Sequence, residues 1–479
     1  MNTYINKTEF NSNREQVHGS YKAAVSLHNK LVGRGELNIS SKYTYQNQIE
    51  DALTITNIFY RTLNDNPVRA ISIIKRTKVG CNGLMIEIAK NMSTHIDDNI
   101  IIMCENIFFI TGMSNRLWEK EFIEQLPSCF NKNVYHHGKI KNIKNKFKDL
   151  RNALIIIDEI DTGDKEGQRL HKTLDNFGLL DIKYMEKNNI RFIFVSATIK
   201  NQLHELYKWG DKHKSYTMTV PKNYISHVDF LEKGIIQEFY SIKDKESAEK
   251  WINEDILEKY KNNFRVHIIR TDIKNICYIK QACDNKNINF SNHTSDNRIS
   301  EKGLQELFDK KLTNHVVIAV KGFYRRANLI PNKWKIKIGA IHERYCNKVD
   351  TSVQVQGLVG RMTGYWKNII FEQEHKTGPY RTSIKAIEQY EKFYSDPKNN
   401  QKYNTNGSKK TFVHPKNISN LNEVEYVDEN KNEDICKTIP ILIDITSEEY
   451  NTVIKKINNK YNTEKIINII SKYDINLEP

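Results

Sequence analysis

Three carboxylates follow a run of apolar residues in the segment ALIIIDEID (153–161), namely Asp158, Glu159 and Asp161. The apolar run has the composition of a strand buried on both faces, as in a parallel sheet covered by helices. Such a strand places its last side chains at the carboxyl edge of the sheet, where open α/β folds bind ligands. An Asp there suits Mg²⁺, and a Glu beside it suits a base that orients a water for attack on a phosphate. The alternative is a buried strand that runs into an acidic turn.

A second candidate for phosphate chemistry is the loop KRTKVGCNG (75–83). It follows a short apolar segment, AISII (70–74), which predicts a strand, and it precedes LMIEIAKNM (84–92), which predicts a helix. A strand, a glycine-bearing loop and a helix in this order are the layout of a phosphate-binding loop.

This loop departs from a working phosphate loop, GxxxxGK[ST], whose Lys reaches the phosphates and whose hydroxyl binds Mg²⁺. Aligning Gly80 with the glycine before the lysine puts Cys81 and Asn82 at the Lys and Ser/Thr positions. A shift of one residue puts Asn82 and Gly83 there instead. Neither alignment supplies the lysine, and the nearest amines are those of Lys75 and Lys78.

The elements that must position these residues alternate between strands and helices in both halves of the chain. The segments that predict strands are 70–74, 99–104, 153–158 and 191–199 in the first half, and 264–270, 315–323 and 335–343 in the second. Helical patterns lie between them. The alternation predicts an α/β fold with two parallel sheets.

Changes in composition predict the domain boundaries. A polar N-terminal extension occupies 1–40, the first α/β domain 41–235, and the second 236–395. A polar linker rich in Asn, Lys, Glu and Asp is expected at 396–435, and a small α+β module at 436–479.

Length and charge restrict the functional classes. At 479 residues the chain is too long for one ordinary core. Its net charge of +15 indicates a polyanionic partner, with nucleic acid as the first candidate, although a composition rich in Lys and Asn would also be basic without such a partner. The sequence shows no long apolar segment, no signal-peptide core and no CxxC pair. We therefore expect a soluble intracellular protein with no membrane partner.

The order of these segments resembles the motif series of superfamily 2 (DExD/H-type) helicase-like ATPases. The matching segments are YQ (45–46), the loop 75–83, DEID (158–161), SAT (196–198) and QGLVGR (356–361). Phrases such as FITGMSNRLW and QGLVGRMTGYW are most similar to helicase-like proteins of large DNA viruses. The resemblance implies two tandem RecA-like (P-loop NTPase) domains that hydrolyse ATP in the cleft between them and move on or unwind nucleic acid.

Carried over residue by residue, the resemblance assigns roles around ATP and Mg²⁺. Asp158 would hold Mg²⁺ through its water shell, Glu159 would orient the attacking water, and Arg361 would be the arginine finger of the second domain. Gln46 would read the adenine edge. The other nucleotide-binding residues that it implies are Lys78, Gly80, Cys81, Asn82, Gly83, Gln356 and Gly360.

The resemblance also implies coupling and nucleic-acid contacts. Asp161, Ser196 and Thr198 would link the state of ATP to the nucleic-acid site. The residues expected to touch the nucleic-acid backbone are Lys321, Arg325 and Arg326. A further departure is Gly364, which stands where the family has a second arginine.

Two functions of different classes follow. The first is an ATP-dependent helicase or translocase whose degenerate phosphate loop slows or abolishes hydrolysis, which fits the retained Asp158, Glu159 and Arg361. The alternative is a catalytically inactive, helicase-derived clamp on nucleic acid, acting with proteins of viral replication or transcription, which fits the altered loop and Gly364. A third interpretation, a nuclease or modification subunit, has no supporting signature in the sequence. The choice between DNA and RNA stays open, and a viral protein would work in host cytoplasm or virion.

Overall fold

The computed structural model describes most of the chain up to residue 413. The described residues are 44–60, 68–94, 102–113, 116–163, 165–294, 296–324, 330–366, 377–400, 403, 405, 411 and 413. By its internal contacts the chain divides into the units 1–423 and 424–479. The predicted extension at 1–40 and the predicted module at 436–479 lie outside the described residues.

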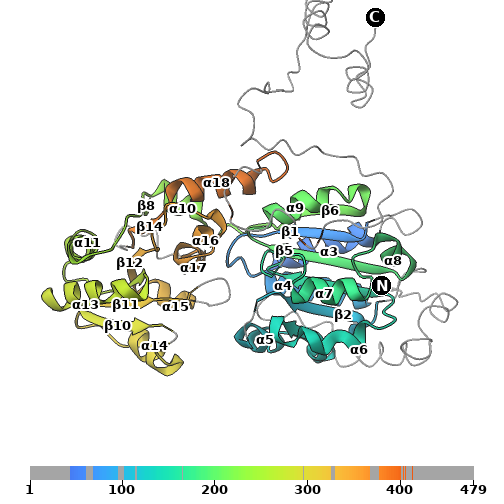
Figure 1. Cartoon of the computed structure of the whole chain (residues 1–479), viewed down its shortest axis with the longest axis horizontal. Helices are drawn as coiled ribbons and strands as arrows, with labels where there is room; N and C mark the ends of the chain where they lie inside the picture. Colours follow the sequence, from blue (N-terminus) through green and yellow to red (C-terminus); the bar gives the residue numbers. More distant parts are fainter. Residues whose placement is uncertain are drawn as a thin grey trace, which may run out of the picture. The chain divides into compact units, whose positions relative to one another are not determined.

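The first half of the chain folds around a six-stranded sheet whose strands are all parallel, in the order β3-β2-β4-β5-β1-β6. The strands are β1 (Ala70–Ile74), β2 (Ile107–Thr111), β3 (Val134–His136), β4 (Ala153–Asp158), β5 (Ile190–Ser196) and β6 (His213–Thr217). Every residue of β1, β2, β4 and β5 is buried, so both faces of the sheet are covered (Figure 1). The apolar, β-branched composition of these strands suits a sheet buried on two sides.

Helices and short turns connect these strands. They are α3 (Gln46–Tyr60), α4 (Cys81–Thr94), η1 (Cys104–Asn106), α5 (Arg116–Ile123), η2 (Ser128–Asn133), η3 (His137–Ile143), α6 (Lys144–Phe147), α7 (Arg169–Asn176), α8 (Ile182–Lys187), α9 (Lys200–Tyr207) and η4 (Gly210–Lys212). Helix α8 shows how the sequence sets a boundary, because the Asp181 carboxylate accepts hydrogen bonds from the first backbone amides of the helix, at Lys183 and Tyr184.

The second half repeats this architecture with another six-stranded parallel sheet, in the order β10-β11-β9-β12-β14-β8. Its strands are β8 (Ile236–Glu238), β9 (Val266–Arg270), β10 (Asn289–His293), β11 (Val316–Val320), β12 (Ile338–His342) and β14 (Tyr380–Thr382). A separate antiparallel pair joins β7 (Tyr224–Ile225) to β13 (Gly364–Tyr365).

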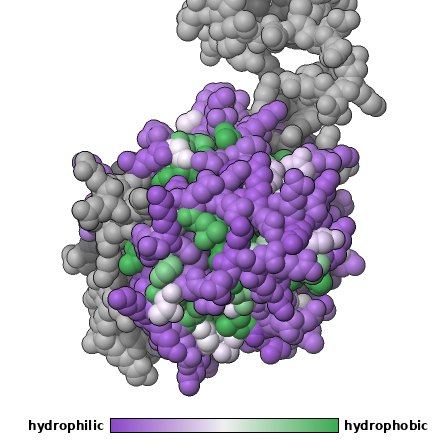
Figure 2. All heavy atoms as spheres, turned by 90° about the vertical axis from the view of Figure 1, so that its left-hand side faces the viewer, coloured by the Kyte–Doolittle hydropathy of each residue, from purple (hydrophilic) through white to green (hydrophobic). Residues whose placement is uncertain are grey.

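Shorter helices accompany the second sheet. They are α10 (His227–Glu232), α11 (Lys245–Trp251), η5 (Ile252–Leu257), α12 (Glu258–Tyr260), η6 (Ile273–Asn275), α13 (Ile276–Asn285), α14 (Glu301–Asp309), α15 (Asn332–Lys335), α16 (Thr351–Val355), α17 (Leu358–Met362) and α18 (Ile384–Ser395). The face in Figure 2 is mostly hydrophilic, with hydrophobic residues scattered over it. In the described part of the chain, no helix has the length and apolar character that a bilayer span requires.

Two parallel sheets covered by helices confirm the predicted α/β class. In the first sheet one strand, β5, separates the acidic strand β4 from the strand β1 that leads into the loop 75–83. The register pairs Ile74 with Ser196 and Asp158 with Val195, so all three strands end at the same edge. The loop 75–83, the DEID segment (158–161) and the SAT segment (196–198) therefore meet at the carboxyl edge of the sheet.

One predicted strand was wrong. The segment 99–104 was expected to form the second strand. Residues 99–101 lie outside the described residues, Ile102 and Met103 belong to no strand, and Cys104 begins the 3-10 turn η1. The strand is β2, five residues IFFIT that pair with β4 from Ile107 onward. Two apolar runs lie next to each other here, and the choice between them depends on pairing with β4. Pairing with a distant strand leaves no local signal in the sequence.

Described residues of the predicted linker 396–435 contact the first domain. The Lys200 amine donates to the carbonyl of Tyr403 at 2.8 Å, and the indole N–H of Trp209 donates to the carbonyl of Val413 at 2.8 Å. Tyr403 and Val413 are both buried. Part of this polar segment therefore packs onto the fold.

Buried histidines tie the stability of this fold to pH. Burial lowers the pKa of His213, His227 and His342 to about 3. In the unfolded chain each would take up a proton near the ordinary histidine pKa of about 6.5. Below that pH the unfolded state binds more protons than the folded state, so the stability is complete above about pH 6.5 and is lost as the pH falls toward 3.

We expect each of these histidines to lower the free energy of unfolding by about 1.4 kcal/mol per pH unit between about pH 6 and about pH 4. Urea unfolding over this range measures the slope. The variant His213→Gln keeps a polar group near the Ser72 hydroxyl, which lies 2.8 Å from His213 Nε2, and should lose one histidine's share of the slope. Equal slopes in the variant and the native protein would contradict this account.

Candidate functional site

A cavity of about 360 Å³ opens at the carboxyl edge of the first sheet. Its walls include nine of the predicted site residues, namely Lys78, Gly80, Cys81, Asn82, Gly83, Asp158, Glu159, Gln356 and Arg361. A second cavity of the same volume lies in the second domain, between Tyr240, Arg270 and Glu343. Only the first collects the predicted acids, the loop and the arginine, so it is the candidate site.

Gln46 does not belong to the walls of this cavity. Its side chain is exposed, and its amide donates to Glu50 Oε1 at 3.0 Å. Gln48, two residues later and buried, donates instead to the carbonyl of Gly80 at 2.7 Å. The glutamine that contacts the phosphate loop is therefore Gln48, and the spacing of the YQ segment gave no sign of the difference.

The start of helix α4 favours one alignment of the phosphate loop. The helix begins at Cys81, directly after Gly80, which has a φ of 88°. In that alignment Cys81 and Asn82 would stand at the Lys and Ser/Thr positions of a phosphate loop. Burial raises the pKa of the Cys81 thiol to about 12, so this side chain is neutral and contributes no positive charge to a phosphate.

Lys75, at the other end of the loop, supplies the positive charge instead. Its amine lies 3.0 Å from Asp158 Oδ1 and 2.9 Å from Glu159 Oε1. Burial alone would lower the pKa of Lys75, but the two carboxylates outweigh burial and raise it above its ordinary value. Lys75, the first residue of the loop, thus supplies the positive charge that balances Asp158 and Glu159.

Trp118 is a site residue that the sequence did not reveal. Its indole N–H donates to Asp158 Oδ2 at 3.1 Å, while Asp158 Oδ1 accepts from the Glu159 backbone amide at 3.0 Å. The available signal was a tryptophan in an amphipathic helix, since a buried indole N–H needs an acceptor. Glu159 itself has a φ of 50°, a left-handed conformation that is uncommon outside glycine and that recurs at functional sites.

The predicted coupling residues are in direct contact. The Asp161 carboxylate accepts hydrogen bonds from the hydroxyls of Ser196 at 2.8 Å and Thr198 at 2.6 Å. Gln356, from the second domain, donates to the Thr198 hydroxyl at 2.5 Å. A continuous polar chain therefore runs from the acidic strand end to the segment that carries Arg361.

Close backbone packing positions Arg361. The amide of Leu358, at the start of α17, donates to Glu343 Oε2 at 2.9 Å. A Cβ on Gly360 would lie 2.0 Å from the carbonyl oxygen of Val355, so only glycine fits at this position. Arg361 follows with 2% of its surface exposed, and it forms part of the cavity wall.

A series of tyrosine hydroxyls, which we call the hydroxyl ladder, holds the phosphate loop. Alternate carbonyls of the loop, at Lys75, Thr77 and Val79, each accept a hydrogen bond from a tyrosine. The donors are Tyr390, Tyr224 and Tyr365, at 3.5, 2.5 and 2.9 Å respectively. Tyr390 and Tyr365 belong to α18 and β13 of the second half of the chain, and Tyr224 belongs to β7, which pairs with β13.

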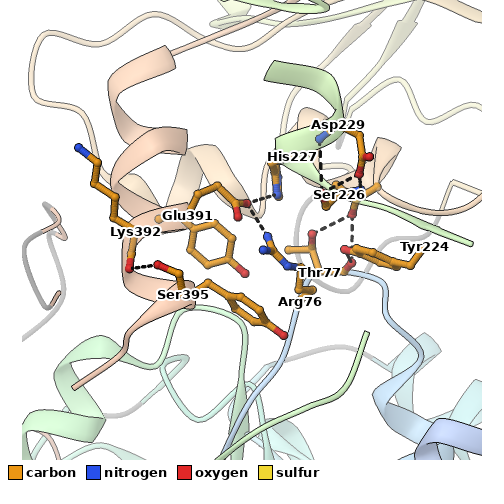
Figure 3. A network of polar contacts seen from close by, with 12 residues as sticks. Arg76, Thr77, Tyr224, Ser226, His227, Asp229, Glu391, Lys392 and Ser395 are labelled. Atoms are coloured by element: carbon orange, nitrogen blue, oxygen red, sulfur yellow. Dashed lines mark hydrogen bonds and ion pairs between the residues drawn. The ribbon is translucent and has the colours of Figure 1, made fainter. Parts of the chain in front are cut away.

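Arg76 adds an ion pair to the ladder (Figure 3). Its guanidinium lies 2.5 Å from Glu391 Oε1 and 4.0 Å from the centroid of the Tyr394 ring. His227 Nδ1 lies 3.7 Å from the same Glu391 oxygen. The loop and helix α18 are therefore held together by charge and by stacking as well as by hydroxyls.

An aromatic pair forms another part of the wall. The rings of Tyr45 and Tyr365 are stacked, with centroids 4.7 Å apart and planes 26° from parallel. Both rings line the cavity beside the phosphate loop. Flat aromatic faces are suited to stacking on a base.

The predicted nucleic-acid residues are separate from this cavity. Lys321 is exposed at the end of β11 and does not line the cavity, and Gly322 follows with a φ of 82°. Arg325 and Arg326 lie outside the described residues.

The sequence matches no protein-family model and no curated protein. Among solved structures, the chain is similar to a variant of Dbp5 from Saccharomyces cerevisiae bound to RNA and ADP BeF3, with 13% identity over 75% of this chain and 94% of that chain and a TM-score of 0.38. It is also similar to a Dbp5 variant bound to a Gle1 variant and IP6, with 13% identity, coverage of 74% and 91%, and a TM-score of 0.37. Likeness at this level does not say what this chain binds or does.

Replacing Lys75 tests the charge balance of the acidic pair. Lys75→Met leaves two adjacent buried carboxylates without their ammonium, and we expect a loss of about 3 kcal/mol in the free energy of unfolding at neutral pH. Chemical denaturation measures this loss. The double variant Lys75→Met with Glu159→Gln, which removes one of the two charges, should recover a large part of it. Equal stability of the single and double variants would show that the charges do not interact as the distances indicate.

Replacing Arg76 tests the attachment of the phosphate loop to α18. Arg76→Ala removes the Glu391 ion pair and the stacking on Tyr394, so we expect faster hydrogen exchange at the amides of residues 75–80 and 384–395. Mass spectrometry of deuterated peptides measures the exchange. Lys392→Ala, at an exposed position on the same helix, is the matched control. Unchanged protection in Arg76→Ala would mean that this ion pair does not hold the loop.

Proposed function

We propose that this chain binds ATP between its two domains and hydrolyses it while acting on nucleic acid, as a helicase or translocase of superfamily 2 type with an altered phosphate loop. One observation carries the proposal. Asp158 and Glu159 from the first domain and Arg361 from the second line the same cavity, beside a loop that leads into helix α4. A carboxylate that orients water and an arginine that stabilises the developing charge are among the groups that transfer of a phosphoryl group to water uses.

The chemistry follows from these positions. The phosphates lie against the loop and the amino end of α4, where backbone amides and the helix dipole favour negative charge. Their charge draws the Lys75 amine away from Glu159, which leaves this carboxylate able to accept a proton from the attacking water. Arg361 then stabilises the charge that develops on the transferred group.

Mg²⁺, predicted at Asp158, does not fit this arrangement as it stands. Both Asp158 oxygens already accept hydrogen bonds, and the Lys75 ammonium lies 3.0 Å from one of them. A metal ion would need Lys75 to withdraw first. The proposed steps therefore use the protein's own charged groups.

Nucleic acid is the proposed partner because of the net charge of +15 and the exposed Lys321 at the end of a strand of the second sheet. Arg325 and Arg326 extend this basic segment in the sequence. The resemblance to helicase-like proteins of large DNA viruses extends the proposal to replication or transcription proteins as further partners, in host cytoplasm or virion.

A second candidate function is a clamp that holds nucleic acid without turnover. The hydrogen bonds of Tyr365 and Tyr390 to the loop and the Arg76–Glu391 pair favour it, because they join the two domains through protein contacts alone. The neutral Cys81 in the lysine position favours it too.

Phosphate release with and without single- and double-stranded DNA or RNA separates the two functions. We expect nucleic acid to stimulate release, and Glu159→Gln to lower the stimulated rate by about 100-fold or more, because the base is lost. Glu124→Gln, at an exposed position after α5, is the control.

If the native protein releases phosphate in the presence of nucleic acid no faster than Glu159→Gln does, the helicase or translocase function is overturned and the clamp remains. The clamp function makes a separate prediction. Its affinity for nucleic acid should fall as salt rises, because binding to phosphates releases counterions. Affinity that is independent of salt would overturn the clamp as well.

A further inference from the structure

The second domain has a cavity of its own, at the carboxyl edge of its sheet. The cavity has a volume of about 360 Å³, and residues that follow two neighbouring parallel strands, β9 and β12, line it. Arg270 is the last residue of β9, and His342 is the last residue of β12. The residues that line this cavity do not line the cavity of the first domain, so the two cavities are separate.

The connections that leave β9 and β12 run in opposite directions. From β9 the chain passes through α13 to β10, which lies beyond β11 on one side, whereas β12 leads to β14 on the other side. The crevice between two such strands is a topological switch point, which is where open α/β sheets bind ligands. The topology therefore makes this cavity a candidate ligand site.

The ionisable side chains that line the cavity have an excess of positive charge. Four are basic and two are acidic, namely Lys243, Arg270, Lys274 and Arg344 against Asp272 and Glu343. Both acids are already paired, because Glu343 forms an ion pair with Arg270 and Asp272 lies 2.8 Å from Arg344. The two lysines therefore contribute positive charges that no acid of the wall balances.

Lys243 and Lys274 are exposed, and neither amine forms an ion pair or a hydrogen bond with a described residue. Asp244, next to Lys243 in the chain, does not line the cavity, and its carboxylate accepts from the Ser247 amide at the start of α11. Two ammonium groups beside one cavity match a phosphate monoester, whose charge is about −1.5 to −2 at neutral pH.

The amino end of a helix adds to this positive potential. Lys274 and Asn275 belong to the turn η6, which continues directly into α13, and both residues line the cavity. Asp272 stands at the cap position, but its carboxylate makes no capping hydrogen bond and pairs with Arg344 instead. The first amides of this helix are therefore left without a side-chain cap, and an anion suits such a helix start.

Two buried polar atoms of the wall have no hydrogen-bond partner among the described residues. They are Nε2 of His342, a residue with 2% of its surface exposed, and the hydroxyl of Tyr240. The two rings are neighbours, with centroids 5.0 Å apart. Buried polar atoms in folded proteins are nearly all paired, so two unpaired ones in the wall of one cavity mark a place where a further polar group binds.

The contacts of His342 indicate which kind of group this is. Its Nδ1 lies 2.8 Å from the carbonyl oxygen of Glu343, and burial lowers the pKa of the ring to about 3. The single ring proton is therefore on Nδ1, and Nε2 is an acceptor. An acceptor beside a hydroxyl is suited to the edge of a nucleobase, which offers amino donors next to nitrogen and oxygen acceptors.

Aromatic rings are also part of the wall. Tyr278 and Tyr345 both line the cavity, and Tyr345 has 41% of its surface exposed. Exposed flat rings are suited to stacking on a base.

We propose that this cavity binds a nucleoside monophosphate. Its phosphate lies at Lys243, Lys274 and the amino end of α13, and its base lies at Tyr345 and the polar atoms of Tyr240 and His342. A free nucleotide and the phosphorylated end of a nucleic-acid strand share this chemistry. The inference does not depend on ATP binding in the first domain, because the two cavities share no residue.

Calorimetric titration of the full chain with AMP tests the phosphate contacts. We expect the double variant Lys243→Met with Lys274→Met to weaken AMP binding about tenfold or more, because charge-assisted hydrogen bonds to the phosphate are lost. Adenosine, which has no phosphate, should bind the native protein and this variant equally. The matched control is Lys245→Met with Lys280→Met, which removes the same charge at exposed positions on α11 and α13 outside the cavity. Equal AMP affinity in the native protein and the first double variant would overturn the inference.

Tyr345→Ala tests recognition of the base. We expect this variant to weaken AMP binding about tenfold, because stacking on the base is lost, and to leave the binding of inorganic phosphate unchanged. An equal effect on the two ligands would overturn recognition of a nucleoside.

Hydrogen exchange and competition locate the ligand and identify its source. AMP should slow exchange at the amides of residues 271–278 and 342–346, and protection confined to residues 75–83 would overturn the inference. Competition with AMP by a short oligonucleotide with a 5′-phosphate, but not by its 5′-hydroxyl counterpart, would identify a strand end as the source. AMP binding that neither oligonucleotide displaces would identify the free nucleotide. Equal competition by both oligonucleotides, or no binding of either AMP or the phosphorylated strand, would overturn the inference.

Discussion

A single buried ammonium between two carboxylates governs the arrangement of this cavity. Charges removed from water are stable only when they are paired and hydrogen-bonded, and Lys75, Asp158 and Glu159 satisfy one another at about the spacing of hydrogen bonds. The indole of Trp118 completes the set. The carboxyl edge of the sheet is therefore balanced by the protein's own groups.

The second half of the chain takes part in the same balance. Arg361 brings positive charge toward the loop, and the hydroxyl ladder holds the loop carbonyls. Because the tyrosines donate to backbone atoms, this attachment does not depend on which side chains the loop carries.

The sequence predicted the parts of this structure that depend on local pattern. Strands β1 and β4 coincide with the apolar runs that predicted them, since a strand buried on both faces has a continuous hydrophobic sequence. Strand β6, HKSYT, was missed because it is polar and partly exposed. The acids of the site and Arg361 were found because their motifs are short and ordered along the chain.

Contacts between distant residues could not be predicted in this way. Nothing near Lys75 in the sequence shows that its amine reaches Asp158 and Glu159, and nothing near Trp118 shows that its indole does so too. Gln46 and Gln48 differ only in which side of α3 they occupy, and the packing of α3 against the loop decides which of them matters.

The return of the chain to the first domain after α18 limits how the two sheets can move. The second sheet is entered through the segment that contains β7 and left through the segment that reaches Tyr403 and Val413, whose carbonyls are bound by Lys200 and Trp209. The second half of the chain is therefore tied to the first at both of its ends, so fewer relative orientations of the two sheets are open to it than a single connection would allow.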